Sequence, residues 1–250
     1  MSLLDGARAR ARARVRTTPD NEIVCHFLKK KKMCVFGSTN ACIIIILTLS
    51  KRRTSNQQGG LQDSAQRELW YQRSLNLWNQ DDTIRDHVVA VENSDGHYDV
   101  PNLELIKFNH SRHHENKFCT RPTRAMGEHE LISLHQGLAS AKRMQGASHV
   151  LKITGRYYIP GIAHMLRNIS HAHEIIHMHG YAGGCQIMGC RLDACRALWK
   201  CPYERYSHCE ATIRTRMHAY DASRRFELPR LHTAYTISGS AGTPVTELAG

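Results

Sequence analysis

The stretch "ACIIIILTL", Ala41 to Leu49, decides how this chain folds. It is an uninterrupted apolar run rich in β-branched isoleucine, with the turn-forming residues "GSTN" before it and a polar loop, Lys51 to Gly60, after it. A short apolar run bounded in this way is typical of a strand that is buried on both faces of a parallel sheet. We therefore expect this strand within the central sheet of an α/β fold.

A membrane anchor is the alternative for the same region. Met33 to Ser50 together span 18 residues, which is the lower limit for crossing a bilayer, and Gly37 to Asn40 interrupt the apolar character. Lysines precede the segment and "KRR" follows it, so the positive charges favour neither orientation. The expected location is the cytoplasm, or the Golgi as a type II membrane protein if residues 33–50 act as an anchor.

Strands and helices alternate along the rest of the chain. Asp63 and Gln66 form a helix-capping pattern, and Tyr71, Leu75 and Trp78 share one helical face after it. The predicted strands are 87–91, 103–108 and 149–153, the predicted helices are 63–78 and 127–144, and beyond Pro160 helices are expected near 161–168, 192–199 and 203–220 with a strand at 233–237. This alternation predicts a Rossmann-like, three-layer α/β fold with a mostly parallel central sheet.

Positive charge is concentrated at the N-terminus. The 250 residues carry a formal net charge of +12, and residues 1–53, with 12 basic and 3 acidic side chains, account for +9 of it. The remaining +3 on residues 54–250 is too small an excess to attract a polyanion, so we expect no specific nucleic-acid partner. Residues 1–32 are predicted to be a basic disordered tail, a candidate for association with anionic membranes, and residues 33–250 a single domain.

Polar residues follow three of the predicted strands. Ligands of open α/β sheets bind outside the carboxyl ends of the strands, which draws attention to Thr48 and Ser50, to "ENSDG" (Glu92 to Gly96) and to "KITGRYY" (Lys152 to Tyr158). In the last of these motifs a lysine and an arginine four residues apart flank Gly155. Glycine allows the backbone to approach a ligand closely, and the two cations suit phosphate, although a surface salt bridge beside a turn is an alternative.

The succession of these motifs resembles a family of GT-A-type glycosyltransferases that act on nucleotide-diphospho-sugars. The resemblance is carried by the first apolar strand, "WYQRSLNLW", "VVAVENSDG", "GEHELISLHQGLASA" and "VLKITGRYYIP", and more faintly by "GGCQIMGC" and "LPRLHTAYTISGSAGTPVTEL". It covers residues 41–160 well and most of the rest loosely. It implies a nucleotide-binding half at 41–160 and an acceptor-binding half at 161–250.

The resemblance also implies which residues bind the donor. Thr48, Glu92, Asn93 and Ser94 would lie near the base and ribose, Lys152, Arg156 and Tyr157 near the diphosphate, and Ser50, Thr154 and Gly155 beside them. The partners would be a nucleotide-sugar donor and a carbohydrate or glycoconjugate acceptor. Inverting transfer also needs a carboxylate that takes the acceptor proton, and Glu210 and Asp193 are the candidates.

The chain departs from the family pattern at one important place. Many GT-A enzymes have a DxD motif after the fourth strand, where its carboxylates hold Mn²⁺ or Mg²⁺ against the diphosphate. Here the same place reads "TGRYY", without a carboxylate. We therefore expect transfer without a cofactor or a DxD-bound metal, with Lys152 and Arg156 stabilising the leaving diphosphate, while a divalent metal stays an alternative.

Two other functions compete with this interpretation. "HEIIH" at His173, Glu174 and His177 matches the short HExxH motif of zinc hydrolases, which requires a helix that presents both imidazoles on one face. The nine cysteines match no paired zinc spacing, and we interpret them as mostly reduced, buried residues. The second competitor is a non-catalytic, transferase-like domain whose basic tail binds other molecules.

Overall fold

The computed structural model describes residues 41–50, 64–94, 96–108, 126–178, 187–200, 209–229, 231–237 and 244–248. All of them lie in the second of two compact units of the chain, Phe36–Gly250. The predicted tail, residues 1–32, and residues 33–40 lie outside the described residues. The division of the domain into a nucleotide-binding and an acceptor-binding half stays a prediction.

Strand β1 (Ile43–Leu49) confirms the strand predicted from the isoleucine run. Each of its residues is at most 5% exposed. It pairs in parallel with β2 (Val88–Glu92) on one side and with β4 (His149–Thr154) on the other, so that Ile46 lies between Val89 and Lys152. Within the described ranges, no helix is both long and apolar enough to span a membrane.

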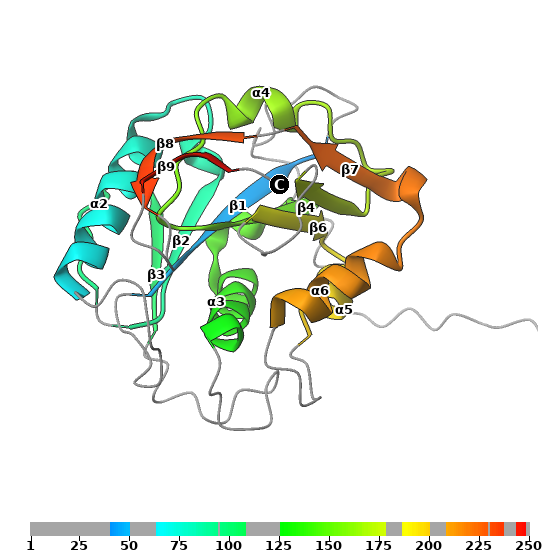
Figure 1. Cartoon of the computed structure of the whole chain (residues 1–250), viewed down its shortest axis with the longest axis horizontal. Helices are drawn as coiled ribbons and strands as arrows, with labels where there is room; N and C mark the ends of the chain where they lie inside the picture. The colour runs from blue at the N-terminus through cyan, green and yellow to red at the C-terminus, as the bar shows by residue number, and fades with distance from the viewer. Residues whose placement is uncertain are drawn as a thin grey trace, which may run out of the picture. The chain divides into compact units, whose positions relative to one another are not determined.

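Seven strands form one sheet in the order β3-β2-β1-β4-β6-β5-β7 (Figure 1). The outer strands are β3 (Glu104–Lys107), β5 (Ile175–Met178), β6 (Ile187–Arg191) and β7 (Arg225–Leu228). Strand β6 runs antiparallel to both of its neighbours, and every other pair is parallel. This arrangement confirms an α/β fold with a mostly parallel central sheet. Strands β8 (Leu231–Ile237) and β9 (Pro244–Leu248) pair separately as an antiparallel ribbon.

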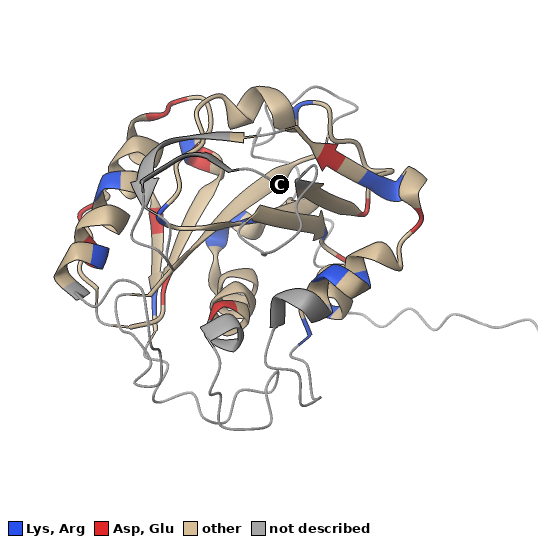
Figure 2. Ribbon diagram, in the orientation of Figure 1, with Lys and Arg blue, Asp and Glu red and all other residues tan. Residues whose placement is uncertain are grey.

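Helices cover both faces of the sheet and make the three layers. Helices α2 (Ser64–Gln80) and α4 (Ile162–Leu166) pack on the face that carries the odd-numbered residues of β1, here called the α2 face. Helices α3 (Met126–Ser140), α5 (Cys195–Leu198) and α6 (Cys209–His218) pack on the opposite, α3 face, against Ile44 and Ile46. Figure 2 shows the central strands mostly in tan, with charged residues mainly on helices and near strand ends.

The predicted elements before Pro160 are confirmed with small shifts of their ends. The largest shift is in α3, which ends at Ser140, four residues before the predicted end, and is followed by a single 3₁₀ turn, Lys142–Met144. Beyond Pro160, α4, α5, α6 and β8 correspond to predicted elements, whereas β5, β6, β7 and β9 were not predicted. Three of these four strands extend the sheet beyond β4, so the second part of the chain completes the sheet begun by the first.

Candidate functional site

The strand order reverses direction at β1, because β2 lies on one side of it and β4 on the other. Such a switch point is where open α/β sheets leave room for a ligand, outside the carboxyl ends of the strands. The register brings the predicted residues of three strands to this edge, since Thr48 pairs with Thr154 and Leu49 pairs with Glu92. Backbone hydrogen bonds also join the loops after β4 and β2 to the end of β1. Gly155 N donates to Thr48 O (2.9 Å), and Asn93 N donates to Leu49 O (3.3 Å).

Lys152 lies on the α3 face of this edge and forms a buried ion pair. Its Nζ atom lies 2.7 Å from Oε1 of Glu130 on α3, and the lysine side chain is 1% exposed against 25% for the glutamate. The hydroxyls of Thr48 (2.8 Å) and Thr154 (3.1 Å) donate to the same oxygen, and Lys152 also donates to Thr154 Oγ1 (3.2 Å). Three donors from two strands therefore converge on one carboxylate oxygen.

The carboxyl group of this ion pair favours its charged form. Burial raises the pKa of Glu130, but the charge of Lys152 and the hydrogen bonds from Lys152, Thr48 and Thr154 outweigh it, so that the pKa is lowered overall. The ammonium of Lys152 was predicted to lie beside a diphosphate, and Glu130 was not among the predicted site residues. The signal was available, because a lysine in a buried strand needs an opposite charge and the facing predicted helix carries Glu128 and Glu130.

Glu92 lies on the other, α2 face of the same edge and is fully buried. Its Oε1 atom accepts hydrogen bonds from the backbone N of Ser94 (2.8 Å) and from the Ser94 hydroxyl. Its Oε2 atom makes no hydrogen bond of good geometry to a described residue. Asn93, the next residue, points elsewhere and donates from Nδ2 to Ser133 Oγ of α3 (3.0 Å). Glu92 therefore has one carboxylate oxygen engaged by Ser94 and another whose hydrogen bonding is incomplete in an enclosed place.

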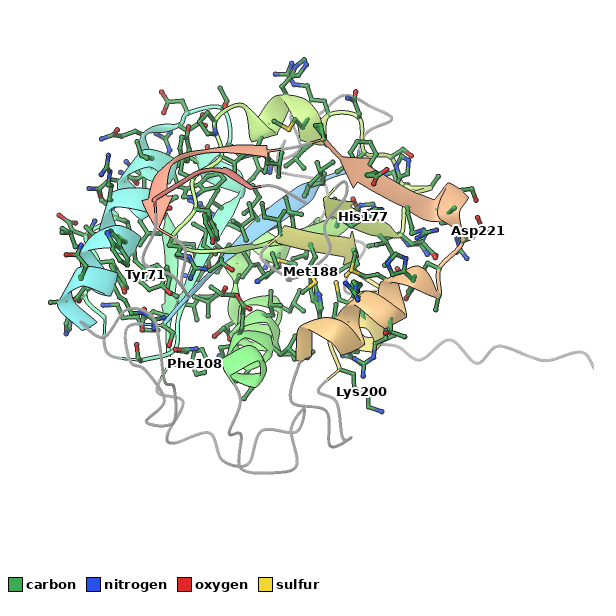
Figure 3. All side chains as sticks on the ribbon, in the orientation of Figure 1. Tyr71, Phe108, His177, Met188, Lys200 and Asp221 are labelled. Atoms are coloured by element: carbon green, nitrogen blue, oxygen red, sulfur yellow. The ribbon has the colours of Figure 1, made fainter. Side chains whose placement is uncertain are left out.

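Tyr98 is a second buried polar side chain on this face, and its residue is only 8% exposed. Its hydroxyl makes no hydrogen bond of good geometry to a described residue, and its polar neighbour is Glu92. Burial, and then the charge of Glu92 and a hydrogen bond to it, raise the pKa of Tyr98 far above its ordinary value, so the hydroxyl keeps its proton. The ring packs edge-on against Tyr71, which Figure 3 shows on α2, with ring centroids 6.2 Å apart.

The turn after β4 is fixed tightly against the sheet and α2. A Cβ on Gly155 would lie 2.2 Å from Leu49 Cδ2 and 2.9 Å from Thr48 O, so only glycine fits. Trp78 Nε1 donates to the carbonyl of Tyr157 (2.9 Å), and the Tyr158 hydroxyl donates to Asp81 (2.9 Å). Burial, together with Asp81, raises the pKa of Tyr158 to about 12.

Arg156 is the cation of this turn. Its side chain is half-buried, its guanidinium carbon lies 4.8 Å from the centre of the Tyr157 ring, and its Nη2 donates to the Tyr157 hydroxyl (2.9 Å). Burial lowers the pKa of Arg156, but Tyr157, Tyr71 and Glu130 raise it by more, so the guanidinium stays charged. The fork of the arginine is therefore held in one orientation by an aromatic ring.

The two candidate catalytic carboxylates lie differently. Asp193 is 65% exposed and lies in the turn after β6, where Arg191 binds it at 2.8 Å and, by that hydrogen bond, lowers its pKa. Arg191 pairs with His149, the first residue of β4, so Asp193 lies near the amino end of that strand, roughly 16 Å along it from Thr154. The structure does not bring Asp193 to the donor edge. Glu210 belongs to α6, and its side chain is outside the described residues.

The helical HExxH interpretation is wrong. His177 lies in strand β5, which begins at Ile175, while His173 and Glu174 precede the strand outside any helix, so the two imidazoles do not share the face of a helix (Figure 3). Glu174 is 7% exposed and forms ion pairs with Arg191 (2.7 Å) and Arg224. In the part of the chain that the structure describes, no three His, Cys, Asp or Glu side chains are arranged to hold a metal ion.

Comparisons with known proteins give no sequence match and a weak structural similarity. No protein-family model and no curated protein matches the chain. A crystal structure from Desulfovibrio desulfuricans G20, named "putative nucleotide-diphospho-sugar transferase", is similar with 12% sequence identity and a TM-score of 0.43, over 75% of this chain and 79% of that one. A similarity this low carries no functional argument, so a function has to be argued from the side chains of the site.

Proposed function

We propose that this protein is a glycosyltransferase that moves a sugar from a nucleotide-diphospho-sugar donor to a hydroxyl of a carbohydrate or glycoconjugate acceptor. The observation that carries the proposal is the buried pair of Glu92 and Tyr98 at the switch-point edge, where neither Glu92 Oε2 nor Tyr98 Oη makes a hydrogen bond of good geometry and the two interact mainly with each other. A buried polar group whose hydrogen bonding is incomplete is unfavourable, so a ligand that supplies better hydrogen bonds binds favourably. A nucleoside supplies such groups on its base and on its ribose.

Arg156 is the group best suited to the diphosphate of the donor. Its charged fork is oriented by Tyr157 and follows Gly155, which packs the turn tightly against β1. Arginine forms bidentate hydrogen bonds with phosphate oxygens. Lys152 has a different role in this proposal, because Glu130 compensates its charge. It fixes Glu130, and through it the hydroxyls of Thr48 and Thr154, at the edge where the donor binds.

Transfer in this proposal does not use a metal held by a DxD motif. The turn Thr154–Tyr158 contains an arginine and two tyrosines but no carboxylate that would hold Mn²⁺ or Mg²⁺ there. The guanidinium of Arg156 would stabilise the negative charge that develops on the departing nucleoside diphosphate. We expect turnover to persist in excess EDTA. Loss of turnover in EDTA that Mn²⁺ restores would overturn this part of the proposal.

The first experiment is a thermal-shift panel of nucleoside diphosphates and their sugars with the full chain. A donor that binds only the folded state raises the melting temperature by mass action. The sharper arm compares Glu92→Gln, which keeps the shape but removes the charge and replaces one acceptor oxygen by a donor, with Asp99→Asn. Asp99 is exposed and lies in the loop that carries Tyr98. We expect the shift to be lost in Glu92→Gln and kept in Asp99→Asn.

A second pair of variants tests the diphosphate group. Arg156→Ala removes the half-buried guanidinium, and Arg167→Ala removes an exposed one just after α4. We expect a nucleoside diphosphate to lose its thermal shift with Arg156→Ala only, while the nucleoside alone behaves alike in both. Equal responses of the two variants to the diphosphate would contradict the assignment.

Turnover separates an enzyme from a binding domain. Glu210 stays the proposed base, and Glu210→Gln should abolish sugar transfer while the donor still shifts the melting temperature. Asp193→Asn is the matched control, because Asp193 lies at the other end of β4. Donor binding without transfer to any acceptor in the wild type would favour a non-catalytic transferase-like domain. Whether the basic tail binds membranes is a separate prediction, tested with residues 1–53 and anionic vesicles.

A further inference from the structure

Two buried cysteines lie in contact at the junction of β6 and α5. Cys190 is 0% and Cys195 is 1% exposed. Their sulfur atoms are 2.9 Å apart, and both side chains are free thiols. A disulfide bond is about 2.05 Å long, so the sulfurs need to approach by less than about 1 Å to be bonded. The pair lies on the α3 face, away from the Glu92 and Tyr98 side chains.

The backbone between the two cysteines is held mainly by backbone hydrogen bonds, with one weak contact from the Cys195 thiol to Arg191 O (3.4 Å). Cys190 belongs to β6, where it pairs with Val150 on one side and Ile175 on the other. The turn that follows is closed by hydrogen bonds from Ala194 N to Arg191 O (2.9 Å) and from Leu192 N to Ser148 O (2.9 Å). Cys195 begins α5. The short distance between the sulfurs is therefore a property of the fold and does not need a bond to maintain it.

We propose that Cys190 and Cys195 are a reversible dithiol–disulfide pair of the native protein, oxidised by low-molecular-weight disulfides. One thiolate attacks the external disulfide and releases one small thiol, leaving a mixed disulfide. The second thiolate then displaces the other small thiol and forms the Cys190–Cys195 bond. Two protein thiols are oxidised and one external disulfide is reduced to two thiols.

The geometry favours the second step over the first. The partner sulfur is already in contact, so closure of the mixed disulfide is intramolecular. Burial raises the pKa of the Cys190 thiol well above its ordinary value, which slows the initial attack and requires α5 to open locally. The resulting bond tethers α5 to β6. Because the carbonyl of Trp199, just after α5, is bonded to His135 of α3 (2.9 Å), the tether also secures a contact of the helix that carries Glu130.

Peptide mapping can test this directly. Arg191 lies between the two cysteines, so trypsin separates residues 168–191 from residues 192–196 unless a disulfide joins them. The first peptide also contains Cys185, and the variant Cys185→Ser leaves Cys190 as its only cysteine. Native Cys185→Ser is equilibrated in glutathione buffers of increasing oxidised fraction, alkylated and digested. We expect the two peptides to become linked, and reductant to release them.

Two outcomes would overturn the proposal. One is that both peptides of native Cys185→Ser stay fully alkylated in the most oxidising buffer. The other is that the link found in the wild type disappears in Cys185→Ser, which would assign it to Cys185. A melting temperature measured with and without reductant gives a second readout, and we expect the oxidised form of Cys185→Ser, but not of Cys195→Ser, to melt a few degrees higher.

Discussion

The two sides of the carboxyl edge differ in how completely their polar groups are satisfied. On the α3 face, Lys152, Glu130, Thr48 and Thr154 satisfy one another. On the α2 face, Glu92 and Tyr98 are buried and interact mainly with each other, and each keeps an atom without a hydrogen bond of good geometry. A closed network fixes strands and helix relative to one another, whereas incomplete hydrogen bonding favours the binding of a ligand. The α3 face of this edge therefore contributes to stability, and in our proposal the α2 face binds a ligand.

Breaking the closed network should have the largest effect. Glu130→Leu leaves the ammonium of Lys152 buried without an opposite charge. We expect the free energy of unfolding to fall by about 3 kcal/mol. This value is at the low end for buried ion pairs because the carboxylate is 25% exposed. Lys152→Met added to it should restore most of the loss. Urea denaturation measures both. Additive losses in the double variant would show that the two residues are not coupled.

A substitution of Gly155, in the turn after β4, should have the next largest effect on stability. Gly155→Ala places a methyl group against Leu49 and the carbonyl of Thr48, so we expect a destabilisation of about 1–3 kcal/mol from overpacking. Leu49→Ala in the same chain should relieve part of it by making room. If Gly155→Ala unfolds at the wild-type urea concentration, the turn is looser than the structure has it.

Acid should destabilise the fold in two ranges of pH. Burial lowers the folded-state pKa of His135 and of His149, so the unfolded chain binds protons first as the pH falls below 6.5 and stability declines there. The pKa of Glu130 is also lowered, so its contribution is present above pH 4.5 and is lost as the pH falls below that value. Urea midpoints between pH 7 and pH 3.5 should therefore fall throughout. In the double variant Glu130→Leu with Lys152→Met, we expect the urea midpoint to fall below pH 6.5 as in the wild type, without the further fall below pH 4.5.

The smallest effect compares one hydroxyl from each side. Tyr98→Phe removes a buried hydroxyl whose contact with Glu92 falls short of good hydrogen-bond geometry, and it should change the free energy of unfolding little. Thr48→Val removes a hydroxyl bonded to Glu130 and should lower it by about 1 kcal/mol. Urea denaturation of the two variants in the absence of ligand measures the difference. Equal losses would mean that the Tyr98 hydroxyl is hydrogen-bonded as well as that of Thr48.

Sequence patterns predicted the first part of the fold well because its elements are long or strongly apolar. The isoleucines of β1 and the periodic Tyr71, Leu75 and Trp78 of α2 are buried as expected. Strands β5 and β6 were missed because "IIHM" and "IMGCR" are short and mix apolar residues with histidine, glycine and arginine. Their position in the sheet is decided by pairing with distant segments, which local periodicity does not record.

The candidate site was predictable as a place and less so as a set of contacts. Thr48, Glu92 and Thr154 meet at one edge because parallel strands end together, and this follows from the order of elements alone. Whether Lys152 faces a ligand or a glutamate depends on which side chains of α3 lie opposite, and Asp193 is placed by the antiparallel direction of β6. Neither of these two placements can be predicted from a local sequence motif.

The distance along the chain between β1 and its sheet neighbours also affects folding during synthesis. Ile43 pairs with His149, a residue synthesised 106 positions later. Until β4 has left the ribosome, one edge of an isoleucine-rich strand has no native partner, and such segments pair readily with copies of themselves. Slow translation between these two strands, or truncation before His149, would therefore lead to aggregation of the nascent chain, and the yield of soluble protein depends on how quickly the second neighbour arrives.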